Sequence, residues 1–131
     1  MFKWFYDCQM EADVSIQVAW NFLTNPSNWH KWTSNCDSFA LDGEFKKGAQ
    51  IKAKVKNRSL FFPITVTEMI PYQTYKTFSA TLFVSQESLY AFQEITPTKT
   101  RITVATYVAA LSYPSLNQLC TAQWNQRGIN A

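Results

Sequence analysis

The sequence predicts an α+β domain in which a curved antiparallel sheet of about seven strands wraps around a C-terminal helix, with two short helices after the first strand. Three observations predict it. Residues 2–10 alternate between two faces, one of them strongly apolar, as a half-buried strand does. Residues 36–109 contain six further strand patterns with short connections, which favours an antiparallel meander. The segment after residue 112 returns to helical spacing.

Two short helices are expected after the first strand. Apolar residues recur at helical spacing over 16–23, and either Asp13 or Ser15 can cap this helix. Asn25-Pro26 ends the helix, because proline lacks the amide proton that a helix interior requires. The same proline suits the first turn of a second helix over 27–32.

Turn-forming residues separate the six later strands. Asp42-Gly43 and Lys47-Gly48 mark two turns, and residues 97–99 make a tight connection. The strands are therefore expected at 36–41, 49–57, 60–70, 74–80, 87–96 and 100–109.

Two features of the strand region stay open. The inward face of 87–96 is undecided, because Tyr90 and Phe92 alternate with Leu89 and Ala91. The apolar run 82–84 falls where a connection is expected, although connections are usually polar. This run either extends a strand, caps the mouth of a cavity or contacts another subunit.

The last segment is predicted to be a helix. Ser112 can cap it, Pro114 suits its first turn and Gly128 marks its end. Its apolar face is formed by Tyr113, Leu116, Cys120 and Trp124.

Composition fits one domain, 1–131, without repeat or linker. The net charge of +3 is too small to indicate a nucleic-acid partner, although half of the basic residues cluster over 46–58. Lysines alternate with aliphatic residues over 51–56, which is typical of a solvated strand face; a surface for anionic lipid or RNA is the alternative. No stretch reaches the roughly 20 apolar residues of a membrane helix, so stable membrane insertion is not expected.

Cysteine usage favours a reducing compartment. Cys8, Cys36 and Cys120 are few, far apart and odd in number, which predicts neither a disulfide framework nor a zinc site. The N-terminus lacks the pattern of a signal peptide. The sequence therefore predicts a cytoplasmic protein.

Nothing in the sequence has the spacing of a catalytic or cofactor site. His30 is the only histidine and has no nucleophile nearby in sequence, so helix packing or exposure is expected for it. Glu68 shares the parity of Ile64 and Val66, so it faces either the interior or solvent at the strand end. No glycine-rich phosphate loop is present. We expect no catalytic residue, no metal and no cofactor.

Four segments together resemble the START-like superfamily, also called SRPBCC or polyketide cyclase/dehydrase-like. Residues 15–32 read S-I-Q-V-A-W-N-F-L-T-N-P-S-N-W-H-K-W, where the family pattern is roughly S-P-E-x-V-W-x-F-L-T-D-P-x-N-W-x-x-W. Residues 45–48, 66–71 and 97–103 resemble the family's later strand and hairpin signatures in the same order. The resemblance spans about residues 4–125 and implies a helix-grip fold. One departure is a short C-terminal helix, whose roughly 14 residues span only about 21 Å.

The resemblance implies a function of binding a hydrophobic small molecule, such as a lipid, fatty acyl group or aromatic polyketide-like metabolite, in an internal cavity. The leading hypothesis is a carrier or sensor of such a molecule. The alternative is a cyclase/aromatase- or dehydrase-like enzyme that uses Tyr75, Tyr90, Glu68 or Arg101. A third hypothesis is a protein-interaction module with a filled core. A homodimer could complete a cavity that the short helix leaves open. The residues expected to line the cavity are Trp29, Trp32, Ile51, Val55, Phe62, Ile64, Val66, Tyr75, Tyr90, Phe92, Val104, Leu116, Cys120 and Trp124.

Overall fold

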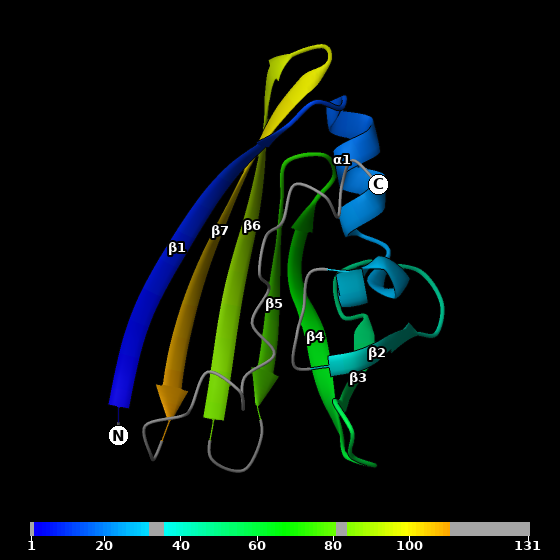
Figure 1. Cartoon of the computed structure of the whole chain (residues 1–131), viewed down its shortest axis with the longest axis vertical. Coiled ribbons are helices and arrows are strands. Elements are labelled where there is room, and N and C mark those ends of the chain that lie inside the picture. The colour runs from blue at the N-terminus through cyan, green and yellow to red at the C-terminus, as the bar shows by residue number, and fades with distance from the viewer. Residues whose placement is uncertain (1, 32–35, 81–83, 111–131) are drawn as a thin grey trace.

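Seven antiparallel strands form one curved sheet in the computed structural model, which describes residues 2–31, 36–80 and 84–110 (Figure 1). The strand order is β1-β7-β6-β5-β4-β3-β2, so β2 to β7 form a meander and β1 pairs with β7. The strands are β1 (Phe2–Ala12), β2 (Cys36–Leu41), β3 (Gln50–Val55), β4 (Phe61–Ile70), β5 (Thr74–Ala80), β6 (Val84–Thr96) and β7 (Lys99–Ala110).

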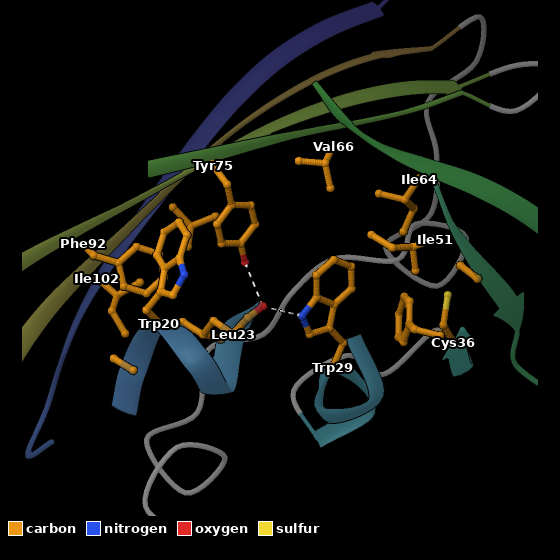
Figure 2. Close-up of a cluster of buried hydrophobic side chains, with 14 of the residues drawn as sticks. Trp20, Leu23, Trp29, Cys36, Ile51, Ile64, Val66, Tyr75, Phe92 and Ile102 are labelled. Atoms are coloured by element: carbon orange, nitrogen blue, oxygen red, sulfur yellow. Dashed lines mark hydrogen bonds between the residues drawn. The ribbon is translucent and has the colours of Figure 1, made fainter. Parts of the chain in front are cut away.

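Two short helical segments follow β1. The α-helix α1 (Ile16–Leu23) begins after Ser15, whose Oγ accepts a hydrogen bond from the Val18 amide at 3.3 Å. Thr24 caps its C-terminal end, and Pro26 then begins the 3₁₀ helix η1 (Pro26–Lys31). Buried residues of α1 face the concave side of the sheet, so the helix covers part of that face (Figure 2).

A β-bulge in β4 decides which side chains face inward. Val66 pairs with Thr77, but Glu68 pairs with Lys76, so one extra residue is inserted in β4. The insertion reverses the parity of the strand after Val66. Glu68 is therefore exposed on the convex face, whereas Met69 packs against the core.

The pairing of β6 with β7 also shows which residues of β6 face the core. Tyr90 pairs with Val104 and Phe92 with Ile102, and Phe92, Val104 and Ile102 are all buried. As far as the register shift after Glu94, even-numbered residues of β6 thus point to the concave face together with even-numbered residues of β7, and odd-numbered residues point to the convex face.

The fold class predicted from the sequence is confirmed for the described residues, with differences at element ends. β3 ends at Val55, because the chain turns there: the Val55 amide donates to the Leu60 carbonyl at 2.9 Å and Asn57 has a φ of 61°. β6 begins at Val84, so this end of the apolar run extends a strand. Leu82 and Phe83 lie outside the described residues, as does the predicted C-terminal helix.

One prediction about the cysteines is wrong. Cys36 is buried at the start of β2 and is disulfide-bonded, where the spacing of the cysteines predicts no disulfide. Sequence spacing misses such a bond because it depends only on which chain segments the fold brings together. Cys8 is a free, exposed cysteine on β1. In the described part of the chain, no helix is long and apolar enough to cross a membrane.

Candidate functional site

The part of the concave face next to α1 is a packed aromatic core. The Trp20 ring meets Phe92 edge-on at 5.1 Å and Tyr75 at 5.8 Å between ring centroids (Figure 2). Tyr75 stacks on Tyr90, with centroids 4.4 Å apart and planes 13° from parallel. These contacts are those of solid packing, which aromatic pairs stabilise beyond the area that they bury.

A second aromatic group joins η1 to β2 and the following loop. The Trp29 ring meets Phe39 edge-on at 5.4 Å and Phe45 at 6.3 Å, and Phe45 reaches Tyr75 at 5.2 Å. An open cleft of about 410 Å³ borders this group. It is lined by Thr24, Asn25, Pro26, Ser27, Phe39, Ala40, Leu41, Gly43 and Phe45.

Beyond this core, the concave face of the sheet becomes polar. Uncharged side chains with hydrogen-bonding groups occupy neighbouring positions on four strands, and we call them the polar band: Tyr6, Thr77, Ser79, Gln86, Ser88 and Thr106. The hydrophobic core cluster includes none of them. The polar band lies on the same face as the aromatic core, and Val108 and Ala110, beyond it on β7, are again buried and apolar.

Three residues of the polar band are deeply buried. Thr77, Ser88 and Thr106 are 7%, 4% and 3% exposed, respectively. The hydroxyls of Ser88 and Thr106 are hydrogen-bonded at 3.1 Å. Burying a hydroxyl without a partner costs about 1–3 kcal/mol in proteins, and this bond avoids that cost for Ser88 and Thr106.

Burial keeps the tyrosines of the concave face protonated. It raises the pKa of Tyr75 well above the usual value and that of Tyr90 strongly, and the neighbouring phenol groups add to both shifts. Burial also raises the pKa of Tyr6, while hydrogen bonding to the Thr106 side chain opposes the rise. These side chains can donate a proton in a hydrogen bond, but they are unsuited to act as bases at neutral pH.

The cavity-lining residues predicted from sequence share the concave side where the structure describes them. Trp29, Ile51, Ile64, Val66, Tyr75, Phe92 and Val104 belong to one buried cluster, and Phe62 and Tyr90 pack against it. Val55 is half-buried and lies outside that cluster. Trp32, Leu116, Cys120 and Trp124 lie outside the described residues.

The other candidates for chemistry lie away from the concave face. Glu68 is exposed and its Oε2 lies 3.8 Å from Lys76 Nζ on the convex face. Arg101 donates to Glu11 Oε1 at 2.9 Å on the same face. His30 is exposed, with Nδ1 2.8 Å from the Ser27 carbonyl oxygen. Among the described residues, no group of three His, Cys, Asp or Glu side chains could hold a metal ion.

The basic strand β3 presents its lysines outward, as its alternation predicts. Lys54 Nζ contacts Asp37 Oδ2 at 2.8 Å, and Lys52 lies over the Phe61 ring at 4.4 Å from its centroid. Both lysines are therefore engaged by neighbours on the protein surface.

The sequence prediction of the site omitted Tyr6, Thr77 and Ser88. The parity of 75–79 with Tyr75 inward would have identified Thr77, because residues two apart share a face. Ser88 required the face of 87–96, which the sequence left open.

No family model matches the sequence, and no curated protein matches it. Solved structures do. A START superfamily protein from Mycobacterium smegmatis matches with a TM-score of 0.68 at 14% identity, covering 85% of this chain and 81% of that one. The Zhui aromatase/cyclase from Streptomyces sp. R1128 matches at 0.67 and 7% identity, over 86% and 72%. Norcoclaurine synthase from Thalictrum flavum, in complex with dopamine and hydroxybenzaldehyde, matches at 0.62 and 11% identity, over 83% and 70%.

Proposed function

Because this chain has the START-like helix-grip fold, we propose that it binds an apolar small molecule against the concave face of its sheet, as a carrier or sensor. The site is the polar band together with the apolar residues beside it. The observation that carries the proposal is the burial of Thr77, Ser88 and Thr106 next to apolar neighbours on one face. Ligand sites typically combine such an apolar surface with a few fixed polar groups.

The location follows from where the packing is already complete. Side chains of α1 and η1 fill the face around Tyr75 and Phe92, so a ligand gains little there. The polar band lies one register step further along the strands, since Thr77 follows Tyr75 at the next inward position of β5. A ligand that loses about 200 Å² of apolar surface gains about 5 kcal/mol before association costs.

Bound molecules in the purified protein test this proposal. Native mass spectrometry of the purified chain should reveal a ligand-bound species, and solvent extraction should recover the ligand. Binding to a panel of lipids and aromatic polyketides should then be saturable, with one molecule per chain. A protein that carries no bound species and binds no member of the panel would contradict the proposal.

A catalytic role is the second candidate, and the two stacked tyrosines favour it. Burial keeps both phenols protonated, so the Tyr90 hydroxyl could donate a hydrogen bond to a carbonyl oxygen of a bound substrate, whereas that of Tyr75 already donates to the Leu23 carbonyl. Glu68 and Arg101, the other residues considered for such a role, lie on the convex face. If the protein is a cyclase-like enzyme, Tyr90→Phe should slow conversion of a poly-β-keto substrate while binding persists; unchanged conversion would exclude a role for the Tyr90 hydroxyl.

A further inference from the structure

We propose that two copies of this chain associate through the outer edges of their β1 strands, which pair antiparallel about a twofold axis at Phe5. The two sheets then continue into one another across the axis. The proposal concerns the edge of the sheet, so it does not depend on whether the concave face binds a ligand.

The two edges of the sheet differ in how they are protected from such pairing. β2 ends the sheet on one side; it has six residues, its pairing with β3 shifts between Cys36 and Ser38, and Trp29 of η1 packs against its Phe39. β1 ends the sheet on the other side (Figure 1), with eleven residues, no proline and an unbroken register with β7. Short strands, bulges and prolines protect natural edges, so β1 is the edge that remains able to pair.

The charges of β1 favour a second copy of the same strand as its partner. Directly paired residues of antiparallel strands share a face of the sheet, and at a twofold axis a residue lies opposite itself. With Phe5 at the axis, Lys3 of each copy lies opposite Asp7 of the other, and all of these residues belong to the convex face. This register therefore forms two ion pairs, one on either side of the axis.

Other registers of the same pairing are less favourable. Only axes at residues 5 and 7 place Lys3 opposite an acidic residue of β1. An axis at Asp7 sets the two Asp7 carboxylates directly opposite each other, and like charges in that arrangement are destabilising. It also sets Lys3 opposite Glu11, which already forms ion pairs with two basic residues of β7. The axis at Phe5 avoids both conflicts.

The charges of Lys3 and Asp7 are not used within the described chain. On β7, Lys3 pairs with Ala109 and Asp7 with Ala105, so the neighbouring strand offers each of them only a methyl group. Both side chains are exposed, and neither forms an ion pair with another residue that the structure describes. By contrast, a lysine of β5 and a glutamate of β6 on the same face form an ion pair with each other. A second copy would supply the counter-charges that β7 lacks.

Exposed aromatic rings lie at the proposed axis. Phe5 is 50% exposed, Tyr107 opposite it on β7 is 56% exposed, and their ring centroids are 4.7 Å apart. Residues directly opposite on paired strands have Cβ atoms about 4.5–5.5 Å apart, so the two Phe5 rings would meet across the axis. Association would extend each pair of rings into a row of four, and such aromatic contacts stabilise cross-strand pairing.

The oligomeric state of the full chain tests the proposal. A contact between two strand edges is narrow, and interfaces below about 1,200 Å² belong to weak complexes. We therefore expect a reversible dimer with a micromolar dissociation constant, seen by sedimentation velocity between about 1 μM and about 300 μM.

Charge reversal tests the register. Lys3→Glu makes both members of each ion pair acidic and Asp7→Lys makes both basic, so each should weaken the dimer at least about tenfold. The double variant Lys3→Glu/Asp7→Lys restores opposite charges and should dimerise within about threefold of the parent. Lys47→Glu changes the net charge as Lys3→Glu does, but in the exposed turn between β2 and β3, and should leave the dimer unchanged.

Cross-linking locates the axis. Cys8 is free and exposed, but with the axis at Phe5 it pairs with position 2, so the two Cys8 residues lie about 20 Å apart along the strands and should not form a disulfide. In a Cys8→Ser background, Phe5→Cys sets two thiols opposite each other at a distance that a disulfide spans, and mild oxidation should link the copies. Gln9→Cys, on the same face, is the matched control and should not link them.

Each result supports or overturns the proposal. A parent chain that stays monomeric over the whole concentration range overturns it. Single charge reversals that dimerise like the parent overturn it as well, as does a double variant that circular dichroism shows to be folded but that does not regain dimerisation. Cross-linking through Cys8 or position 9, and not through position 5, places the axis elsewhere and overturns the register.

Discussion

Trp29 and Tyr75 donate hydrogen bonds to one acceptor, the main-chain carbonyl oxygen of Leu23. Trp29 Nε1 lies 2.8 Å from this oxygen and Tyr75 Oη 3.3 Å (Figure 2). Leu23 is the last residue of α1, whose final carbonyls lack partners within the helix. The two bonds thus join the end of α1 to η1 and to β5, and fix both helical segments against the sheet.

Removing either donor should destabilise the protein by different amounts. Tyr75→Phe removes one hydrogen bond while the Trp29 bond remains, so we expect a loss of about 1 kcal/mol in the free energy of unfolding. Trp29→Phe removes the shorter bond and leaves a cavity, which should cost about 3 kcal/mol. Urea unfolding followed by circular dichroism measures both. A Tyr75→Phe protein that loses as much stability as Trp29→Phe would contradict this ranking.

The cap of α1 gives a second prediction. Ser15 Oγ accepts from the Val18 amide, so Ser15→Ala leaves an amide at the helix start without its partner and should cost about 1 kcal/mol. Ser15→Asp retains an acceptor at the same place and is the matched control. In thermal unfolding, the Ser15→Ala protein should therefore melt at a lower temperature than the Ser15→Asp protein. Equal stability of the two variants would mean that the cap does not contribute.

Acid should weaken the link between β2 and the turn after β3. Hydrogen bonds from the Lys54 ammonium and then from the Asn57 amide hold the pKa of Asp37 below its ordinary value of 3.8. A carboxyl whose folded pKa is lowered contributes stability above its unfolded pKa, and that contribution is lost as pH falls through the folded pKa. Asp37→Asn should therefore make the loss of stability below about pH 3.8 shallower. If chemical unfolding shows that the parent protein and Asp37→Asn lose stability equally as the pH falls, this prediction is wrong.

Alkali should destabilise the aromatic core. Burial raises the pKa of Tyr90 above the ordinary value of 10.0, so the folded state keeps a proton that the unfolded state releases. Its contribution is complete below about pH 10 and is lost as pH rises toward the folded pKa. Tyr90→Phe should make the alkaline loss of stability shallower, and tyrosinate absorbance should rise together with unfolding. Full tyrosine ionisation in a protein that stays folded would contradict the expectation.

Local signals in the sequence were sufficient for the order of the strands and helices that the structure describes, although not for the ends of β3 and β6. The spacing over 16–23 identifies α1 and its packed face, and the turns at Gly43 and Gly48, both with positive φ, separate the strands correctly. The sequence could not predict which residues of β6 face the core, because apolar residues occupy both alternating sets of positions there. It is set by pairing with β5 and β7, which depends on contacts distant in sequence.

The candidate site was predictable only in part. Apolar periodicity identified Val66 and Val104 on the concave face, but the bulge after Val66 that turns Glu68 outward has no sequence signal. The polar band was missed for a different reason: hydroxyl residues on a strand usually indicate a solvated face. Only the three-dimensional register reveals that Thr77, Ser88 and Thr106 are neighbours and buried.

Native mass spectrometry of two neighbouring substitutions tests the binding face most directly. Ser88→Phe adds a ring to the concave face in the middle of the polar band, whereas Glu87→Phe adds the same ring to the exposed convex face. With circular dichroism confirming that both proteins are folded, each is titrated with resveratrol, an aromatic polyketide, beside the parent chain. We predict a one-to-one complex for the parent and for Glu87→Phe, and none for folded Ser88→Phe. Equal complex formation by the two variants would contradict binding on the concave face.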